Sequence, residues 1–256
     1  MKKVCLFWMT IYMVSISSLS GEKPSAVDIL ENIDRNMVFG TAYLEVDMHI
    51  TIKGRTINKS WISYCQGSAQ SYVEFLSPPR DRGTKILKIR DVIKIYYPSA
   101  ERVMRLSGHM LRQSLMGSDF SYEDMTRRAV KLKEDYTAEI EAEEEFHGRP
   151  CYLLIMTSKI EKQTYFTRKT WVDKERFVGW KEELYARSGK LLKILTVKDI
   201  ESINNRFYPT RVIMEDKLRE NSKTEMVIKK IDFDIPIPPD TFNERRLTKK
   251  VPLDRE

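Results

Sequence analysis

The chain has 256 residues, of which 41% are hydrophobic and 32% are charged, with a formal net charge of +7. This composition describes a soluble, highly charged protein whose length is ample for a buried core. No dense run of Lys and Arg is interleaved with aromatic residues, which argues against nucleic-acid binding. The mild positive excess favours either an anionic membrane surface or acidic partner, or simply a solvated surface of mixed sign.

Residues 1–20 have the pattern of a secretory signal peptide. Lys2 and Lys3 form a positive n-region, an apolar stretch follows over 4–16, and Ser18 and Ser20 are small residues at the positions that signal peptidase reads. The apolar stretch is shorter than a membrane span requires, and an uncleaved anchor is the alternative. We therefore expect an exported protein. No linker interrupts residues 21–256, which we expect to form one domain.

Residues 24–39 are predicted to form an amphipathic helix. Pro24 and Ser25 give a start signal, Asp28 completes a variant of the capping box, and Gly40 ends the helix. One face is apolar and consists of Ala26, Ile29, Leu30, Ile33 and Met37. Such a helix needs an apolar surface to lie on.

Alternating residues predict antiparallel strands through most of the remaining chain. The clearest is 41–52, where Ala42, Leu44, Val46, Met48, Ile50 and Ile52 form the buried face and Tyr43, Glu45, Asp47, His49 and Thr51 the wet one. Further strands are expected at 56–65, 69–76, 84–90, 92–97, 102–106, 136–146, 151–158, 164–172, 178–185, 191–200, 207–216 and 224–233. The pattern predicts a β-meander of roughly ten or eleven strands, which must curl, split or close.

The sequence gives no sign of a metal site or a cofactor site. Glu139, Glu141, Glu143 and Glu145 alternate along one predicted strand, so their carboxylates diverge and are interpreted as a solvent face rather than a calcium site.

Two cysteines of the mature chain, Cys65 and Cys151, lie in predicted strands. They form either a disulfide or two separate buried thiols, because an oxidising compartment permits both.

Residues 99–128 interrupt the alternation. Apolar residues recur there at mixed helical spacings around Gly108 and Gly117, and four of them are methionines, which provide adaptable apolar surface. We predict helices at 24–39 and 108–128 that fill the concave face of a curled sheet. An apolar cavity in such a fold is by default a lipid site. The expected lining residues, with ordinary core as the alternative for each, are Met104, Leu106, Met110, Leu111, Leu115, Met116 and Phe120, joined by Trp61 and Trp171 from strands.

Five stretches carry a resemblance to a known family: FLSPPRDRGTKIL at 75–87, YYPSAERVMRLSGHMLRQSLMGSDFSYEDM at 96–125, RKTWVDK at 168–174, KEELYARSGKLLK at 181–193 and RFYPTRVIMEDKL at 206–218. The chain resembles the LolA-like outer-membrane lipoprotein-sorting proteins of bacteria over about residues 25–250, in the branch often found beside lipid exporters.

The resemblance implies a mainly β fold with helices (α+β), an unclosed antiparallel β-barrel or half-barrel wrapped around helices. It also implies a periplasmic carrier that holds acyl chains of lipids or lipoproteins in its apolar cavity during outer-membrane sorting. The implied partners are lipids or lipoproteins, an inner-membrane exporter, and the membrane in transient contact.

Two alternatives remain open. The first is a lipid acyl-ester hydrolase, for which Ser107, His109, Ser114, Ser118 and Asp119 supply the residue types of a nucleophile, a base and an orienting group. The nucleophile-elbow motif G-x-S-x-G is absent from the sequence, and a lone histidine is more often structural. The second alternative is an accessory docking module of an exporter.

Overall fold

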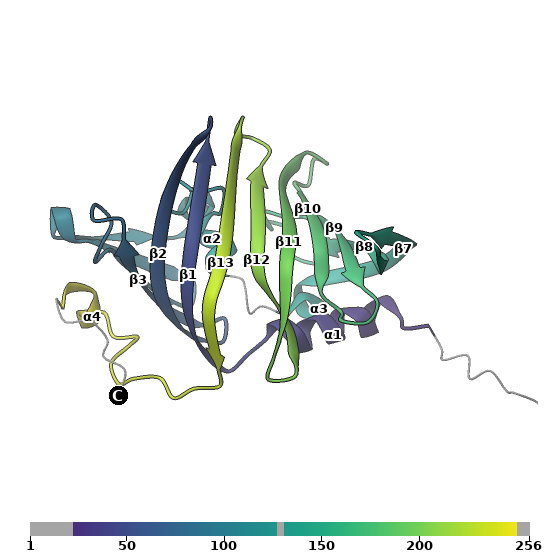
Figure 1. The fold of residues 1–256 in the computed structure, drawn as a ribbon, viewed down its shortest axis with the longest axis horizontal. Helices are drawn as coiled ribbons and strands as arrows, with labels where there is room; N and C mark the ends of the chain where they lie inside the picture. Colours follow the sequence, from purple (N-terminus) through teal and green to yellow (C-terminus); the bar gives the residue numbers. More distant parts are fainter. Residues whose placement is uncertain (1–22, 127–130, 250–256) are drawn as a thin grey trace, which may run out of the picture.

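The computed structural model describes residues 23–126 and 131–249, so the signal peptide predicted at 1–20 lies outside the described residues. Across those two ranges, no helix combines the length and the apolar character needed to span a membrane. Both Figure 1 and the strand pairing show that one large β-sheet dominates the fold.

The sheet contains 13 strands among the described residues, one for each of the thirteen ranges in which the sequence predicts a strand, so the overall figure of ten or eleven was too low. They are β1 (Thr41–Ile52), β2 (Arg55–Gln66), β3 (Gln70–Ser77), β4 (Lys85–Ile89), β5 (Val92–Tyr97), β6 (Arg102–Leu106), β7 (Tyr136–Phe146), β8 (Arg149–Ser158), β9 (Thr167–Asp173), β10 (Gly179–Tyr185), β11 (Leu191–Ile203), β12 (Arg206–Asp216) and β13 (Ser222–Phe233).

The short helical elements are α1 (Ala26–Met37), η1 (Pro98–Ala100), η2 (Gly108–Arg112), α2 (Tyr122–Thr126), α3 (Leu132–Asp135) and α4 (Arg245–Thr248). The predicted first helix is therefore confirmed. The predicted helix over 108–128 is wrong, because only η2 and α2 are helical within its described part, and residues 127–130 lie outside the described residues.

Two antiparallel meanders make up the sheet, whose strand order is β6-β5-β4-β3-β2-β1-β13-β12-β11-β10-β9-β8-β7. Every neighbouring pair is consecutive in sequence except β1 and β13, which join the two meanders with Met48 opposite Met226. Residues 107–135 connect the two edge strands β6 and β7. This segment, which we call the crossover, therefore has to pass from one edge of the sheet to the other.

The helix α1 begins where the sequence predicts because Ser25 and Asp28 form a reciprocal capping box. Its apolar face packs on β7, β8 and β9 at one end of the sheet, in a cluster that contains Ile29, Leu30, Ile33, Tyr136, Leu154, Met156 and Val172. Asn36 fixes the other side of α1, since its amide donates to the Arg176 carbonyl oxygen at 2.7 Å and accepts from the Phe207 amide at 3.0 Å.

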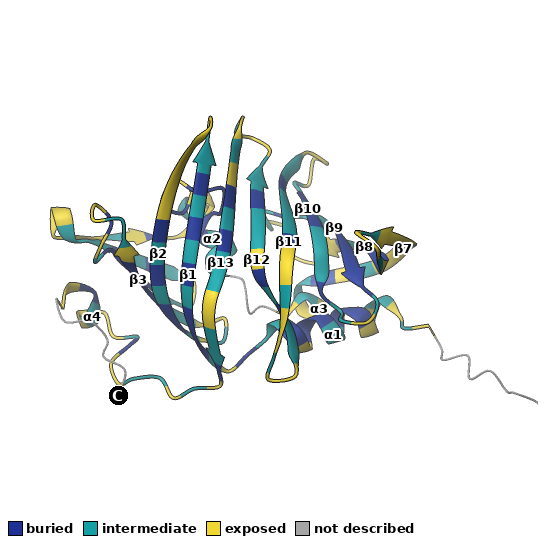
Figure 2. Cartoon of the chain, viewed as in Figure 1, coloured by how far each residue is buried: buried dark blue, intermediate teal, exposed yellow. Residues whose placement is uncertain are grey.

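We define the inner face of the sheet as the side of β1 that carries Leu44, Val46 and Met48. These side chains are 3% exposed or less and belong to the largest apolar cluster, which the crossover joins through Leu115 and Phe120. Figure 2 shows the buried residues recurring in bands along β1, β13 and β12, and Figure 1 shows α2 behind those strands. The alternation predicted for β1 thus buries the expected face.

The opposite, outer face of β1 is not wholly wet, which corrects the expectation for Tyr43. Tyr43, Tyr64 and Tyr72 are buried there beneath the C-terminal tail, residues 235–249. Leu247 of the tail is buried in this cluster, and Ile235, Ile237 and Phe242 pack around it. The alternation of β1 depends on residues 41–52 alone. It therefore could not predict that the C-terminal tail, which is far away in sequence, covers the outer face.

Candidate functional site

Between η2 and α2, the crossover is a tight irregular loop. The Leu115 amide donates to the Phe120 carbonyl oxygen at 2.8 Å, and between them Met116 and Gly117 adopt left-handed backbone conformations with φ of 50° and 87°. A continuous helix does not contain such a turn. The loop directs Leu115 and Phe120 onto the inner face, where they are 3% and 4% exposed.

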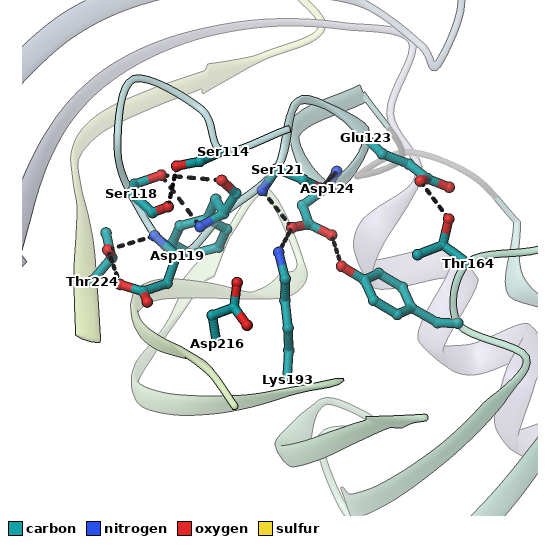
Figure 3. Close-up of polar contacts among 12 residues, drawn as sticks. Ser114, Ser118, Asp119, Ser121, Glu123, Asp124, Thr164, Lys193, Asp216 and Thr224 are labelled. Carbon is teal, nitrogen blue, oxygen red and sulfur yellow. Dashed lines mark hydrogen bonds and ion pairs between the residues drawn. The ribbon is translucent and has the colours of Figure 1, made fainter. Parts of the chain in front are cut away.

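A first polar anchor ties this loop to β13 (Figure 3). Asp119 and Thr224 are both buried; the Asp119 amide donates to the Thr224 hydroxyl oxygen at 2.9 Å, and that hydroxyl donates to Asp119 Oδ2 at 2.6 Å. Arg219 donates to the Ser118 carbonyl oxygen at 2.7 Å. Burying a polar group without a hydrogen-bond partner costs free energy. The reciprocal hydrogen bonds between Asp119 and Thr224 therefore hold the loop in one place.

A second anchor ties α2 to β11 and to Tyr165, in the same meander as β13 (Figure 3). Asp124 accepts hydrogen bonds from Lys193 Nζ at 2.7 Å, from the Tyr165 hydroxyl at 2.6 Å and from the Ser121 amide at 2.7 Å. Burial and the neighbouring Asp124 carboxylate raise the pKa of Tyr165 well above its ordinary value. The crossover is therefore attached to the second meander by a buried ion pair as well as by apolar contacts.

Two apolar cavities lie against the inner core, and the larger of these two lies between α1, the crossover and the inner face of β8–β13. Its volume is about 240 Å³, and its walls include Ile33, Met37, Phe120, Met156, Leu184, Leu195, Val197, Val212, Met214, Met226 and Ile228. An apolar cavity of about 150 Å³ holds a benzene molecule, so this space has room for a larger apolar group such as a segment of an acyl chain.

A smaller cavity of about 60 Å³ lies on the other side of the crossover, against β1–β5. Its walls include Leu44, Val46, Trp61, Val73, Phe75, Leu115 and Tyr122. Tyr208 of β12 borders both cavities. The crossover thus forms a wall of each cavity.

One group of polar side chains on the wall of the larger cavity comes from β9 and β10. Arg168 Nη2 donates to Glu182 Oε2 at 2.7 Å, and the Thr170 hydroxyl donates to Glu182 Oε1 at 3.0 Å. The Arg168 guanidinium also lies 5.3 Å from the centroid of the Tyr136 ring. Burial alone lowers the pKa of Arg168, but Glu182 and Tyr136 raise it by more, so the group stays charged.

The structure brings eight of the nine predicted lining residues together on the inner side. Trp61, Leu106, Leu115 and Phe120 are buried in the inner cluster, and Met104, Met110, Leu111 and Met116 pack against it. Trp61 and Leu115 border the smaller cavity and Phe120 the larger one.

Trp171 is the exception, because it lies on the outer face with Cys151 and Leu153. Its Nε1 donates to Glu144 at 2.8 Å, and Lys181 Nζ lies 4.4 Å from its ring centroid. Successive residues of a strand point to opposite faces, so Arg168 and Thr170 face inward while Trp171 faces outward.

The residues of the hydrolase alternative do not form a catalytic arrangement. The Ser114 hydroxyl donates to the Ser118 carbonyl oxygen, and the Ser118 hydroxyl donates to the Phe120 carbonyl oxygen at 3.2 Å. Ser107 and His109 are exposed near η2, and no hydrogen bond within the described residues joins His109 to Ser107, Ser114, Ser118 or Asp119. The buried members of this set, Ser118 and Asp119, form hydrogen bonds that stabilise the loop conformation.

Cys65 and Cys151 are free thiols. Six strands separate β2 from β8 in the sheet, and Cys65 borders the inner cavity while Cys151 lies in the outer cluster. This separation is incompatible with disulfide geometry. Within 23–126 and 131–249, no group of three or more His, Cys, Asp or Glu side chains is arranged to hold a metal ion.

Sequence reasoning missed much of the larger cavity. Met156, Leu184 and Met214 lie in correctly predicted strands, but which of their faces points inward depends on the β1–β13 pairing. Arg168 and Glu182 lie in strands that the sequence predicts, but neither residue was named as a site residue. Alternation along β9 places Arg168 on the same face as Thr170. A charged residue on the inward face of a strand is the signal that could have identified Arg168 as a cavity residue.

A family profile described only as that of an uncharacterized protein matches residues 67–249. No curated protein sequence matches the chain significantly.

Three crystal structures share the fold over most of both chains. A DUF1329 family protein from Desulfovibrio piger is 24% identical, covering 87% of this chain and 97% of the other with a TM-score of 0.79. A putative outer membrane lipoprotein-sorting protein domain from Vibrio parahaemolyticus is 21% identical, with coverages of 88% and 98% and a TM-score of 0.77. A LolA superfamily protein from Nitrosomonas europaea is 25% identical, with coverages of 87% and 99% and a TM-score of 0.72. The chain belongs to the LolA-like family.

Proposed function

We propose that this protein is a periplasmic carrier that binds acyl chains of lipids or lipoproteins in its inner cavities and takes part in outer-membrane lipoprotein or lipid sorting. The single observation that carries the proposal is the larger cavity, whose walls are predominantly apolar and whose volume is about 240 Å³. The lipoprotein-sorting description of one structural neighbour supports the same role.

The driving force is the removal of acyl methylenes from water. Each buried methylene contributes about 0.8 kcal/mol, so a chain that fills the cavity binds strongly without any specific polar contact. Met156, Met214 and Met226 supply unbranched, polarizable wall surface that adapts to chains of different shape. Met110, Leu111 and Met116 of the crossover pack against the inner apolar cluster, to which Met214 and Met226 also belong.

Release requires a state with lower affinity or a better acceptor, because a ligand shifts an equilibrium only by its differential affinity for two states. The crossover borders both cavities and is held by the Asp119 and Asp124 anchors. We propose an inner-membrane exporter as the donor of the cargo, with transient membrane contact during loading.

Native mass spectrometry of the exported protein, followed by denaturing extraction and lipid identification, tests the carrier function. The proposal predicts bound phospholipid or acylated peptide, and loss of that mass on unfolding. Recovery of lysolipid with free fatty acid would favour the hydrolase instead. A protein that is empty and also takes up no added acylated peptide would contradict the carrier function.

A further inference from the structure

The larger cavity contains one polar group whose hydrogen bonds are incompletely used. Arg168 offers five N–H donors in a planar fork. Glu182 accepts from Nη2, while the buried Nε has no hydrogen-bond partner among the described residues. An unpartnered buried donor carries a desolvation penalty that a ligand acceptor would relieve.

The position of Arg168 within the cavity is fixed by strand register. Arg168 lies opposite Met156 of β8 and Leu184 of β10, and all three border the larger cavity. Its guanidinium is held between the Tyr136 ring and the Glu182 carboxylate. An acyl chain packed along Met156 and Leu184 would therefore bring its polar end to this group.

The charge around Arg168 determines which kind of lipid polar group can bind there. Glu182 balances the guanidinium directly, and the Glu182 side chain is itself largely buried. The other basic residue on the cavity wall, Lys181, directs its ammonium to the outer face, where it contacts Trp171. The acidic residues on the described wall are Asp34, Asp124, Asp135 and Glu182. The cavity thus offers donors without a positive excess, and a buried anion without a counter-charge is strongly disfavoured.

We propose that Arg168 binds an uncharged carbonyl oxygen of an acyl ester, and that the Arg168–Glu182 pair selects esterified acyl lipids over ionised free fatty acids. This inference rests on the proposed carrier function and adds a specificity-determining residue to it. A guanidinium matched by a carboxylate donates hydrogen bonds to a carbonyl, whereas a fatty-acid carboxylate at the same place faces Glu182.

Binding of two probes with the same chain, 1-palmitoylglycerol and palmitate, tests the selection. At about pH 8 the fatty acid is ionised. Titration of the delipidated full-length mature protein is expected to give about tenfold or more tighter binding of the ester. Arg168→Met, which keeps an apolar stem, is expected to weaken ester binding by about tenfold and abolish the preference.

Glu182→Gln provides the opposite change, since it leaves Arg168 without its counter-charge. We expect it to strengthen palmitate binding and reduce or reverse the preference. Lys169→Met is the matched control: Lys169 precedes Thr170 on the same strand but pairs with Glu141 on the outer side, so both affinities should stay unchanged.

The outcomes separate the two proposals. Equal binding of both probes by the wild-type protein, or tighter binding of palmitate, overturns the selection by Arg168 and leaves the carrier function standing. Binding of neither probe contradicts both. The wild-type ratio decides the matter even where a variant fails to fold.

Discussion

Asp124 of α2 and Lys193 of β11 form an ion pair inside the protein, with 2.7 Å between Oδ2 and Nζ and with side chains only 8% and 11% exposed. Asp124 comes from the segment that connects the two edges of the sheet, and Lys193 from the second meander. The wall between the two cavities is therefore attached by charge, in an interior that is otherwise mostly apolar.

The ion pair gives the first prediction. Asp124→Asn leaves the Lys193 ammonium without its buried partner, so we expect a loss of about 2–4 kcal/mol in the free energy of unfolding. Asp216 lies opposite Lys193 in the pairing of β11 with β12 (Figure 3), so the expected loss is below that of a fully isolated charge. Urea unfolding measures the loss, and hydrogen exchange should show earlier opening of residues 114–125 than of β1.

The matched control for this variant is Lys217→Met, which removes a lysine from the half-exposed Lys217–Glu215 pair on the same meander. Exposed pairs contribute about 0–1 kcal/mol, so this variant should be nearly neutral. Equal stability of the two variants would show that the Asp124–Lys193 pair does not hold the crossover.

Asp173 gives a prediction for pH dependence. Burial alone would raise the pKa of its carboxyl, but hydrogen bonds from Arg149, Trp180 and the backbone amides of Glu175 and Arg176 outweigh it and lower the pKa to about 2. A depressed folded-state pKa contributes stability above the unfolded-state value, and that contribution is lost as pH falls from about 4 to about 2.

We therefore expect the wild-type protein to lose about 2 kcal/mol more than Asp173→Asn over that window. Unfolding free energies measured at several pH values test the difference. Glu143 also has a pKa lowered to about 2 by Lys174 and Lys23, but it is solvent-exposed, so added salt should weaken its effect and not that of Asp173. Parallel pH profiles of the wild type and Asp173→Asn would contradict this account.

The C-terminal tail gives the third prediction. Leu247 is 1% exposed and fills a cluster with Tyr43, Tyr64 and Tyr72 on the outer face. Leu247→Ala should cost about 2–4 kcal/mol of stability and make the tail sensitive to protease, without changing acyl binding at temperatures where the protein is folded. Arg245→Ala, an exposed neighbour, should stay within about 0.5 kcal/mol of the wild type. Impaired acyl binding in Leu247→Ala would contradict the separation of the two faces.

Local patterns predicted the elements well where one face of a single segment decides the structure. The strand at 41–52 has the predicted bounds because six alternating apolar residues meet one inner core, and α1 begins at its capping box. The resemblance correctly implied an open antiparallel sheet. Neither signal distinguished the inner from the outer face of β8–β10, since that assignment depends on β1 pairing with β13.

The errors have physical causes of the same kind. Apolar residues in 104–125 all contact one interior, which imitates helical spacing, but Met116 and Gly117 adopt left-handed conformations that turn the chain. Trp171 is a large apolar residue of the kind that lines cavities, but it lies on the opposite face of β9 from Arg168. The partners of Tyr43 and Lys193 lie far away in sequence, so no window contains them.

The two cysteines give the fourth prediction. Burial raises the pKa of the Cys151 thiol to about 11, whereas Cys65 is half-buried at the smaller cavity. A thiol reagent at neutral pH should modify Cys65 in the folded mature protein and spare Cys151, because the thiolate is the reactive form. An acyl ligand that enters the smaller cavity should slow the reaction of Cys65. Cys65→Ser should abolish modification, and prompt labelling of Cys151 would contradict the buried position of β8.

The most direct test of the central claim is to map where a bound acyl chain lies. A palmitoyl ester with a photoreactive diazirine at the chain end is bound, irradiated and located by peptide mass spectrometry. The carrier account predicts adducts at the wall of the larger cavity, at Phe120, Met156, Leu184 or Met214. Adducts confined to the outer face, at Trp171 or Trp180, would contradict it.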